Sequence, residues 1–213
     1  MDVHVLVRVW LPDRPGALGL VASRIGSVGG DIVGIDVLET GNGVAIDEFA
    51  VMLADPELVP LLVREIGEVD GASVEEVREV AQFPDPRLDA LASATRICEA
   101  GSSLALEHTL VEHVTTEFLA EWAALVQGDV LRACAGHPPP ATQLVALAAG
   151  TSASPAVAEG MTGPEDLAVA GLPAHGCTLL VGRGDAPFRR RERAQLMALA
   201  GIADRMWSVL DQR

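Results

Sequence analysis

The stretch Leu11-Pro12-Asp13-Arg14-Pro15-Gly16-Ala17-Leu18 decides the fold of the first part of this chain. It follows residues 3–10, where valines alternate with other residues in the period-two pattern of a β-strand. It leads into residues 16–28, where apolar residues recur at helical spacing until two consecutive glycines end the pattern. The proline and glycine inside the stretch favour a turn, so the sequence predicts a strand, a tight turn and a helix.

The predicted helix start is a candidate binding site for a small ligand. A helix that begins at Gly16 leaves its first N–H groups unpaired, at the positive end of the helix dipole. The N–H groups of Gly16, Ala17 and Leu18 can then point at a carboxylate. Asp13 and Asp31 end and begin neighbouring strands, so we expect both at one end of the sheet, where a carboxylate accepts from a ligand ammonium group. Alternatively, Asp13 caps the helix and the glycines only make turns.

The rest of the first 80 residues completes a small α+β domain. Residues 32–38 and 44–53 read as two strands of a hairpin. Asp55 is the expected N-cap of a second helix, with Pro56 in its first turn. Residues 74–80 form a fourth strand. The order βαββαβ is that of a ferredoxin-like sandwich.

A second domain is predicted after a short linker. Residues 81–87 contain two prolines, which stop the preceding strand and stiffen the connection. Residues 88–213 begin with two helices and end with an amphipathic helix. Four strands are expected between them, at residues 122–126, 130–135, 167–171 and 178–182. Residues 142–150 fit a helix or a strand. The sequence therefore predicts two domains, 1–80 and 88–213.

Charge and composition exclude several classes of partner. The chain has 30 acidic and 15 basic residues, a net charge of −15, and every basic residue is an arginine. Such a charge argues against general binding to nucleic acid or to an anionic membrane. Asp2, His4 and Arg8 interrupt the first apolar run, so we expect no signal peptide. Residues 144–149 are too short an apolar segment to span a bilayer.

The three cysteines point to a reducing compartment. Cys98, Cys134 and Cys177 are widely spaced and form no Cys-x-x-Cys pair. An odd number without a secretion signal indicates reduced thiols, and we expect each to be a small core residue. A cytoplasmic protein is the resulting expectation.

Residues 1–80 resemble an ACT domain, a regulatory module that binds amino acids in many enzymes and transcription regulators. The resemblance is carried by residues 11–18, the following helix, and Gly29-Gly30-Asp31-Ile32. In that family the turn after the first strand and the start of the second strand hold the ligand, often across a dimer interface. The resemblance implies a ligand site made of Asp13, Pro15, Gly16, Ala17, Leu18, Gly30, Asp31 and Ile32. Many amino-acid-binding members carry Asn at the place of Asp31.

Residues 88–213 are more loosely similar to a GAF domain. The likeness lies in the two-helix start, Glu121-Trp122-Ala123-Ala124-Leu125, Gly171-Leu172-Pro173, and Phe188 before a helix rich in Ala and Leu. GAF domains are antiparallel sheets flanked by helices, which bind small molecules and dimerise. The resemblance carries over no individual pocket residue.

The remaining polar residues suggest no catalytic machinery. His108 and His113 are five residues apart, which does not suit a metal pair on one helix face. His137 and His175 are expected in loops, at surface or turn positions. The arginines of residues 189–193 form either a solvated helix face or a site for an anion or acidic partner.

The sequence thus predicts a non-catalytic regulatory protein without cofactor or metal. It would sense a small metabolite, first of all an amino acid, and relay this through a homodimer or a protein partner. One alternative is a structural or interaction module that dimerises without binding any metabolite. An enzyme is the other, although no nucleophile–base or metal set can be assembled from the residues.

Overall fold

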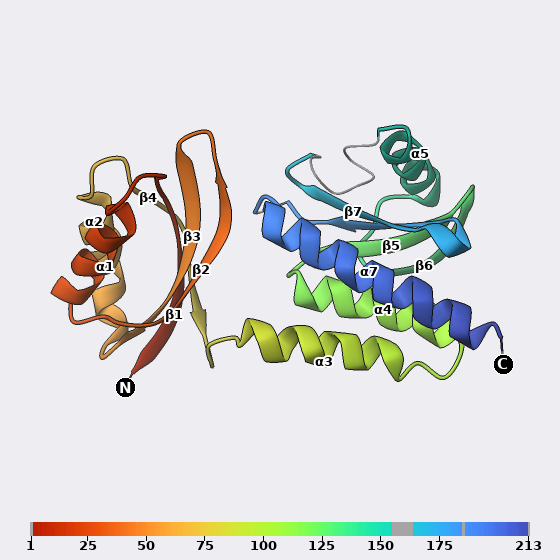
Figure 1. Ribbon diagram of the computed structural model, residues 1–213, viewed down its shortest axis with the longest axis horizontal. Helices are drawn as coiled ribbons and strands as arrows, with labels where there is room; N and C mark the ends of the chain where they lie inside the picture. The colour runs from red at the N-terminus through yellow and green to blue at the C-terminus, as the bar shows by residue number, and fades with distance from the viewer. Residues whose placement is uncertain (1, 155–163, 185, 213) are drawn as a thin grey trace. The chain divides into compact units, whose positions relative to one another are not determined.

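The computed structural model describes residues 2–154, 164–184 and 186–212 (Figure 1). The chain forms two compact units, Met1–Asp85 and Pro86–Arg213. Each unit contains one four-stranded sheet, and all paired strands within it run antiparallel. The predicted α+β class is confirmed, with a βαββαβ sandwich followed by an antiparallel sheet flanked by helices.

The first unit is the predicted βαββαβ sandwich. Its elements are β1 (Val3–Pro12), α1 (Ala17–Ser27), β2 (Asp31–Gly41), β3 (Val44–Leu53), α2 (Val59–Gly67) and β4 (Ser73–Val80). The strands lie in the order β2-β3-β1-β4, so β1 and β2 are separated by β3 although they are consecutive in the chain. Both helices cover the same face of the sheet (Figure 1).

The core of this unit follows from the two periodicities of the sequence. Alternate residues of β1 point to the helix-covered face, while every third or fourth residue of α1 points back to the sheet. The buried residues contributed by these two elements are Val5, Val7, Val9, Leu11, Ala17, Val21 and Ile25.

Two glycines end α1 as predicted. Gly29 has a φ of +77°, which suits a residue without Cβ. Its N–H donates to the Gly26 carbonyl at 3.0 Å, and the N–H of Gly30 donates to the Ile25 carbonyl at 3.1 Å. These two bonds form the Schellman motif that satisfies the last carbonyls of a helix.

The predicted cap at Asp55 is present, but it caps a different element. The Asp55 Oδ1 accepts from the N–H of Glu57 at 2.9 Å. The residues that follow form a 3-10 turn, Pro56–Leu58, and α2 begins only at Val59. The proline that predicts a helix start therefore opens a short turn first.

The second unit places helices on both faces of its sheet. Its elements are α3 (Pro86–Cys98), α4 (Ser103–Glu117), β5 (Trp122–Gln127), β6 (Val130–Gly136), α5 (Ala141–Ser152), β7 (Leu167–Leu172), β8 (Cys177–Gly182) and α7 (Arg190–Leu210). The strand order is β6-β5-β8-β7. In Figure 1, α3, α4 and α7 lie on one side of this sheet and α5 on the other. The ambiguous residues 142–150 are helical.

The two faces of this sheet carry separate cores. Leu110 of α4 and Leu196 of α7 belong to a large cluster on one face. Leu144 of α5 packs with Ala124 and Leu180 on the other. Within the described residues, no helix has the length and apolar character needed to cross a membrane.

Candidate functional site

The turn between β1 and α1 is closed by main-chain hydrogen bonds. The Asp13 N–H donates to the Gly43 carbonyl at 2.9 Å, and the Ala17 N–H donates to the Arg14 carbonyl at 3.2 Å. Gly16 has φ +91° and ψ −16°, which is left-handed backbone. The helix therefore begins at Ala17, one residue later than predicted, because Gly16 serves as the cap.

Among the described residues no side chain caps the start of α1, so the alternative in which Asp13 caps the helix is wrong. The sequence also predicted that the N–H groups of Gly16, Ala17 and Leu18 are all free. This is wrong for Ala17, because its N–H donates to the Arg14 carbonyl within the turn. Among the described residues, the N–H groups of Gly16 and Leu18 have no hydrogen-bond partner. Two backbone donors thus remain at this end of the helix.

The two predicted halves of the ligand site lie at opposite ends of the sheet. Asp13 follows Pro12, which pairs with Val44 at one end of β3. Asp31 pairs with Met52 at the other end of β3, which is level with His4 of β1. Val44 and Met52 are eight residues apart on β3, which corresponds to about 27 Å at 3.4 Å per residue. The expectation that Asp13 and Asp31 share one end is therefore wrong.

The strand directions explain this separation. Both β1 and β2 run antiparallel to β3, so they run parallel to each other, and α1 returns the chain to the starting end. One end of the sheet holds Asp13, Pro15, Gly16, Ala17 and Leu18. The other end holds Gly30, Asp31 and Ile32. The eight candidate residues form two groups rather than one pocket within a single copy.

A buried carboxylate missed by the sequence analysis lies on β3. Asp47 pairs with Val9 on one side and Val37 on the other, on the helix-covered face. Its exposed fraction is only 2%, and its Oδ1 has no hydrogen-bond partner in the described part of the chain. Burial raises the pKa of Asp47, and the negative charge of Asp13 raises it further. The signal was an Asp between Ala45 and Phe49, at an inward position of an alternating strand.

The edge strand β2 carries exposed apolar side chains. Val33, Ile35 and Val37 are 56%, 40% and 50% exposed. Within the described residues β2 pairs only with β3, so its other edge presents unpaired backbone groups. An apolar edge of this kind is a site for pairing with another strand.

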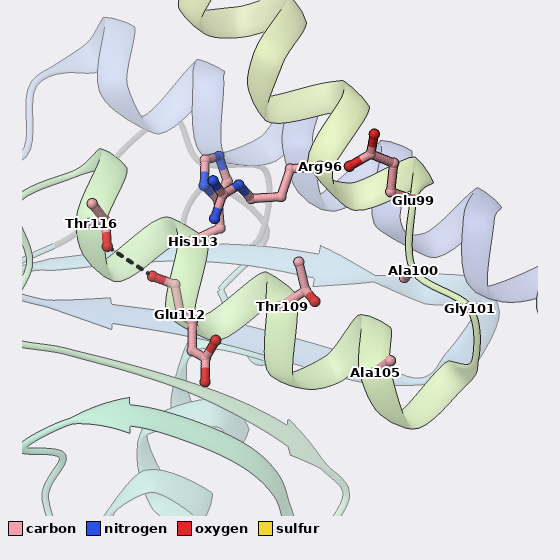
Figure 2. Close-up of a pocket in the computed structure, with 9 residues that line it drawn as sticks. All are labelled: Arg96, Glu99, Ala100, Gly101, Ala105, Thr109, Glu112, His113 and Thr116. Carbon is pink, nitrogen blue, oxygen red and sulfur yellow. Dashed lines mark hydrogen bonds between the residues drawn. The ribbon is translucent and has the colours of Figure 1, made fainter.

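An open groove of about 710 Å³ runs between α3 and α4 in the second unit (Figure 2). The lining residues are Arg96, Glu99, Ala100, Gly101, Ala105, Thr109, Glu112, His113 and Thr116. The His113 Nε2 has no hydrogen-bond partner among the described residues. Burial lowers the pKa of His113, as does the positive charge of Arg96. No group of three or more metal-ligating side chains gathers in the part of the chain that the structure describes.

His175 belongs to a packed network rather than to a surface loop. Its Nδ1 lies 2.7 Å from Asp204 Oδ1, and its ring stacks on Trp207 with centroids 4.5 Å apart. Asp204 Oδ2 also accepts from the Ala174 N–H at 3.1 Å. The backbone is in the predicted turn, but the side chain is only 12% exposed. These contacts hold the turn between β7 and β8 against α7.

The cysteines differ in exposure. Cys177 is buried, and burial raises the pKa of its thiol to about 11. A thiol with this pKa is protonated at neutral pH and is a poor nucleophile. Cys98 and Cys134 are exposed, so the prediction of a core position is wrong for both. Both lie on the outward side of their elements, α3 and β6.

The arginine cluster is partly structural. Arg189 and Arg193 are each 6% exposed, so the interpretation as a solvated face is wrong for these two. Arg193 donates from Nη1 to the Leu167 carbonyl at 2.7 Å and from Nη2 to the Pro164 carbonyl at 2.6 Å. Arg193 therefore ties α7 to the start of β7.

No family model matches this chain, and no curated protein matches it. Similar solved structures include the ACT domain of a GTP pyrophosphokinase from Chlorobium tepidum, at 16% identity and a TM-score of 0.31, which covers 38% of this chain and 100% of that domain. The regulatory subunit of aspartate kinase from Thermus thermophilus has 15% identity and a TM-score of 0.32, over 44% of this chain and 73% of that one. A bacteriophytochrome from R. palustris has 12% identity and a TM-score of 0.39, over 84% of this chain and 47% of that one. The fold of each unit rests on its own sheet topology rather than on these alignments.

Proposed function

We propose that this protein is a non-catalytic regulator that senses an amino acid through its first unit. The observation that carries the proposal is the division of the predicted ligand site between the two ends of one sheet. A second copy of the chain would supply the half that the first copy places too far away. Binding would therefore depend on the homodimer, which gives the ligand a direct way to control assembly.

Pairing of β2 with the β2 of a second copy would reunite the two halves. Symmetric dimers bring the same surface of both copies together, and two edge strands related in this way run antiparallel. The start of one β2 then lies beside the end of the other. Asp31 of the second copy would reach the end of the sheet where the Asp13 N–H meets Gly43. Pairing would also cover Val33, Ile35 and Val37.

The chemistry of the turn supports a reversible ligand. The N–H groups of Gly16 and Leu18, which no described residue accepts, lie at the positive end of the α1 dipole and suit a carboxylate. The second unit would relay the signal through its own contacts or through a protein partner, in keeping with its GAF-like fold.

The test is a thermal-shift screen of the full chain against the twenty amino acids, with the oligomeric state measured by light scattering. We expect one amino acid to raise the unfolding midpoint, and this shift to disappear in Gly16→Val and Asp31→Ala. Ile35→Lys is expected to give a monomer that no longer binds, although every candidate site residue is intact. Leu104→Lys, at an exposed leucine of the second unit, is the control that keeps both properties.

Other outcomes assign other functions. A dimer whose midpoint moves with none of the amino acids would favour the alternative, an interaction module that binds no metabolite. The apolar edge of β2 is the observation that favours that alternative. A monomeric Ile35→Lys that still binds the amino acid would show that the site is complete within one copy.

A further inference from the structure

Asp47 carries a buried acceptor, Oδ1, that the described residues leave without a hydrogen bond. Buried carboxylates are normally paired with a cation or with several hydrogen-bond donors, because an unpaired buried charge is costly. The chain contains no lysine, and Asp47 Oδ1 has no partner among the described residues. Asp47 as a whole is 2% exposed, and its buried Oδ1 therefore cannot recover this loss by contact with water.

Asp47 lies on the face of the sheet that carries α1, toward the end of β3 where the chain enters α1. It alternates along β3 with Ala45 and Phe49, which pack with Ala17 and Val21 of α1 in the same core. Its cross-strand neighbour Val9 lies four residues before Asp13. Asp13 is near enough for its charge to act on the Asp47 carboxyl group. The free N–H groups of the α1 start are thus on the same side of the sheet and at the same end.

The geometry points to Asp47, together with Asp13, as the acceptor for a primary ammonium group of the bound ligand. This inference rests on the proposed function and deepens it, because it states how the second charged group of an amino acid is held. The N–H groups at the start of α1 take the carboxylate, and the carboxylate of Asp47 takes the ammonium group. Asp47 is then paired only when the ligand is present.

This arrangement also defines the class of ligand. Two carboxylates at one end of the sheet, joined by Asp31 of a second copy, repel any further negative charge. An amino acid with a neutral or basic side chain fits such a site, whereas an acidic one does not. A 2-hydroxy acid of the same shape lacks the ammonium group and leaves Asp47 unpaired.

The experiment compares the full-length wild type with Asp47→Asn, which keeps the shape of the side chain and removes its charge. Asp2→Asn removes an equal charge from an exposed position before β1 and is the matched control. Asp13→Asn tests the second carboxylate. Titration calorimetry measures binding of the amino acid found in the screen and of its 2-hydroxy analogue. A second arm measures thermal shifts with methylammonium and tetramethylammonium chloride at equal ionic strength.

We expect Asp47→Asn to weaken binding of the amino acid by about ten- to a hundredfold, the effect of losing a hydrogen bond to a charged group. Asp2→Asn should bind like the wild type, and the 2-hydroxy analogue should bind weakly to all variants. Methylammonium, which donates hydrogen bonds, should stabilise the wild type more than tetramethylammonium does, and Asp47→Asn should abolish this difference.

The two arms separate this inference from the proposed function. Unchanged affinity of Asp47→Asn for the amino acid overturns the inference and leaves the proposed function standing. A methylammonium effect that depends on Asp47, in a protein that binds none of the amino acids, supports the inference and overturns the proposed function. A wild type that binds none of the amino acids and shows no methylammonium effect dependent on Asp47 overturns both. Circular dichroism confirms that each variant is folded.

Discussion

Two glycines three residues apart should respond in opposite ways to the same substitution. Gly16 precedes α1 with a φ of +91°, whereas Gly19 lies within the first turns of the helix. A Cβ added at either position meets no atom within 4 Å, so neither substitution creates a steric clash with other residues. Only the local backbone conformation differs, and it sets the sign of each effect.

The magnitudes follow from the backbone at each position. Alanine in left-handed backbone costs about 1–2 kcal/mol, so Gly16→Ala should destabilise the first unit by that amount. Alanine in a helix is favoured over glycine by about 1 kcal/mol, so Gly19→Ala should stabilise it. In a domain of this size each kcal/mol corresponds to roughly 4–8 °C in the unfolding midpoint.

Hydrogen exchange measured by mass spectrometry reports on each unit separately. Amides of β1 and β3 should exchange about 5- to 30-fold faster in Gly16→Ala and about fivefold more slowly in Gly19→Ala. Peptides from the second unit, β5 for example, provide the internal control and should not change. A Gly16→Ala protein as stable as the wild type would refute the left-handed cap and the helix start at Ala17.

Three further predictions concern other parts of the structure. Because the pKa of Asp47 is raised, the folded protein loses stability as the pH rises from 3.8, the ordinary pKa of this side chain, through its pKa in the folded state. The stability of Asp47→Asn relative to the wild type, measured by urea titration, should therefore increase over this pH range. A stability difference that is the same at all pH values would contradict this. Gly182→Ala should destabilise the second unit by about 1–3 kcal/mol, because the new Cβ overlaps the Trp122 ring; unchanged tryptophan fluorescence and unfolding would contradict the packing. A thiol reagent at neutral pH should label the two exposed cysteines in the native protein and reach Cys177 only after unfolding; fast native labelling of all three would disprove its burial.

Much of the fold could be predicted because its signals are local. The valine alternation of β1, the apolar spacing of α1 and the glycine pair at residues 29–30 each act through neighbours in the chain. The cap at Asp55 was predictable for the same reason, since its partner is two residues away. The four strands of the second unit lie within a residue or two of the predicted ranges.

The candidate site could be predicted only as separate pieces. The sequence indicated correctly that a turn at Pro15 and Gly16 precedes the helix, and the left-handed backbone of Gly16 is seen only in the structure. It could not show that the Ala17 N–H donates within that turn, because this depends on where the backbone places the Arg14 carbonyl. Burial of Arg193 depends on the carbonyls of residues 164 and 167, which lie far away in the chain.

The amino-acid sequence by itself therefore determined the order of the elements, the two α+β units and the motif at residues 11–18. Only the tertiary structure decided which residues meet. The strand order β2-β3-β1-β4 makes β1 and β2 parallel, and this puts Asp13 and Asp31 at opposite ends of one sheet. The same pairing turns Asp47 to the helix-covered face, where the residue is buried and its Oδ1 has no hydrogen-bond partner among the described residues. Strand pairing joins residues that are distant in the chain, so local sequence patterns do not predict it.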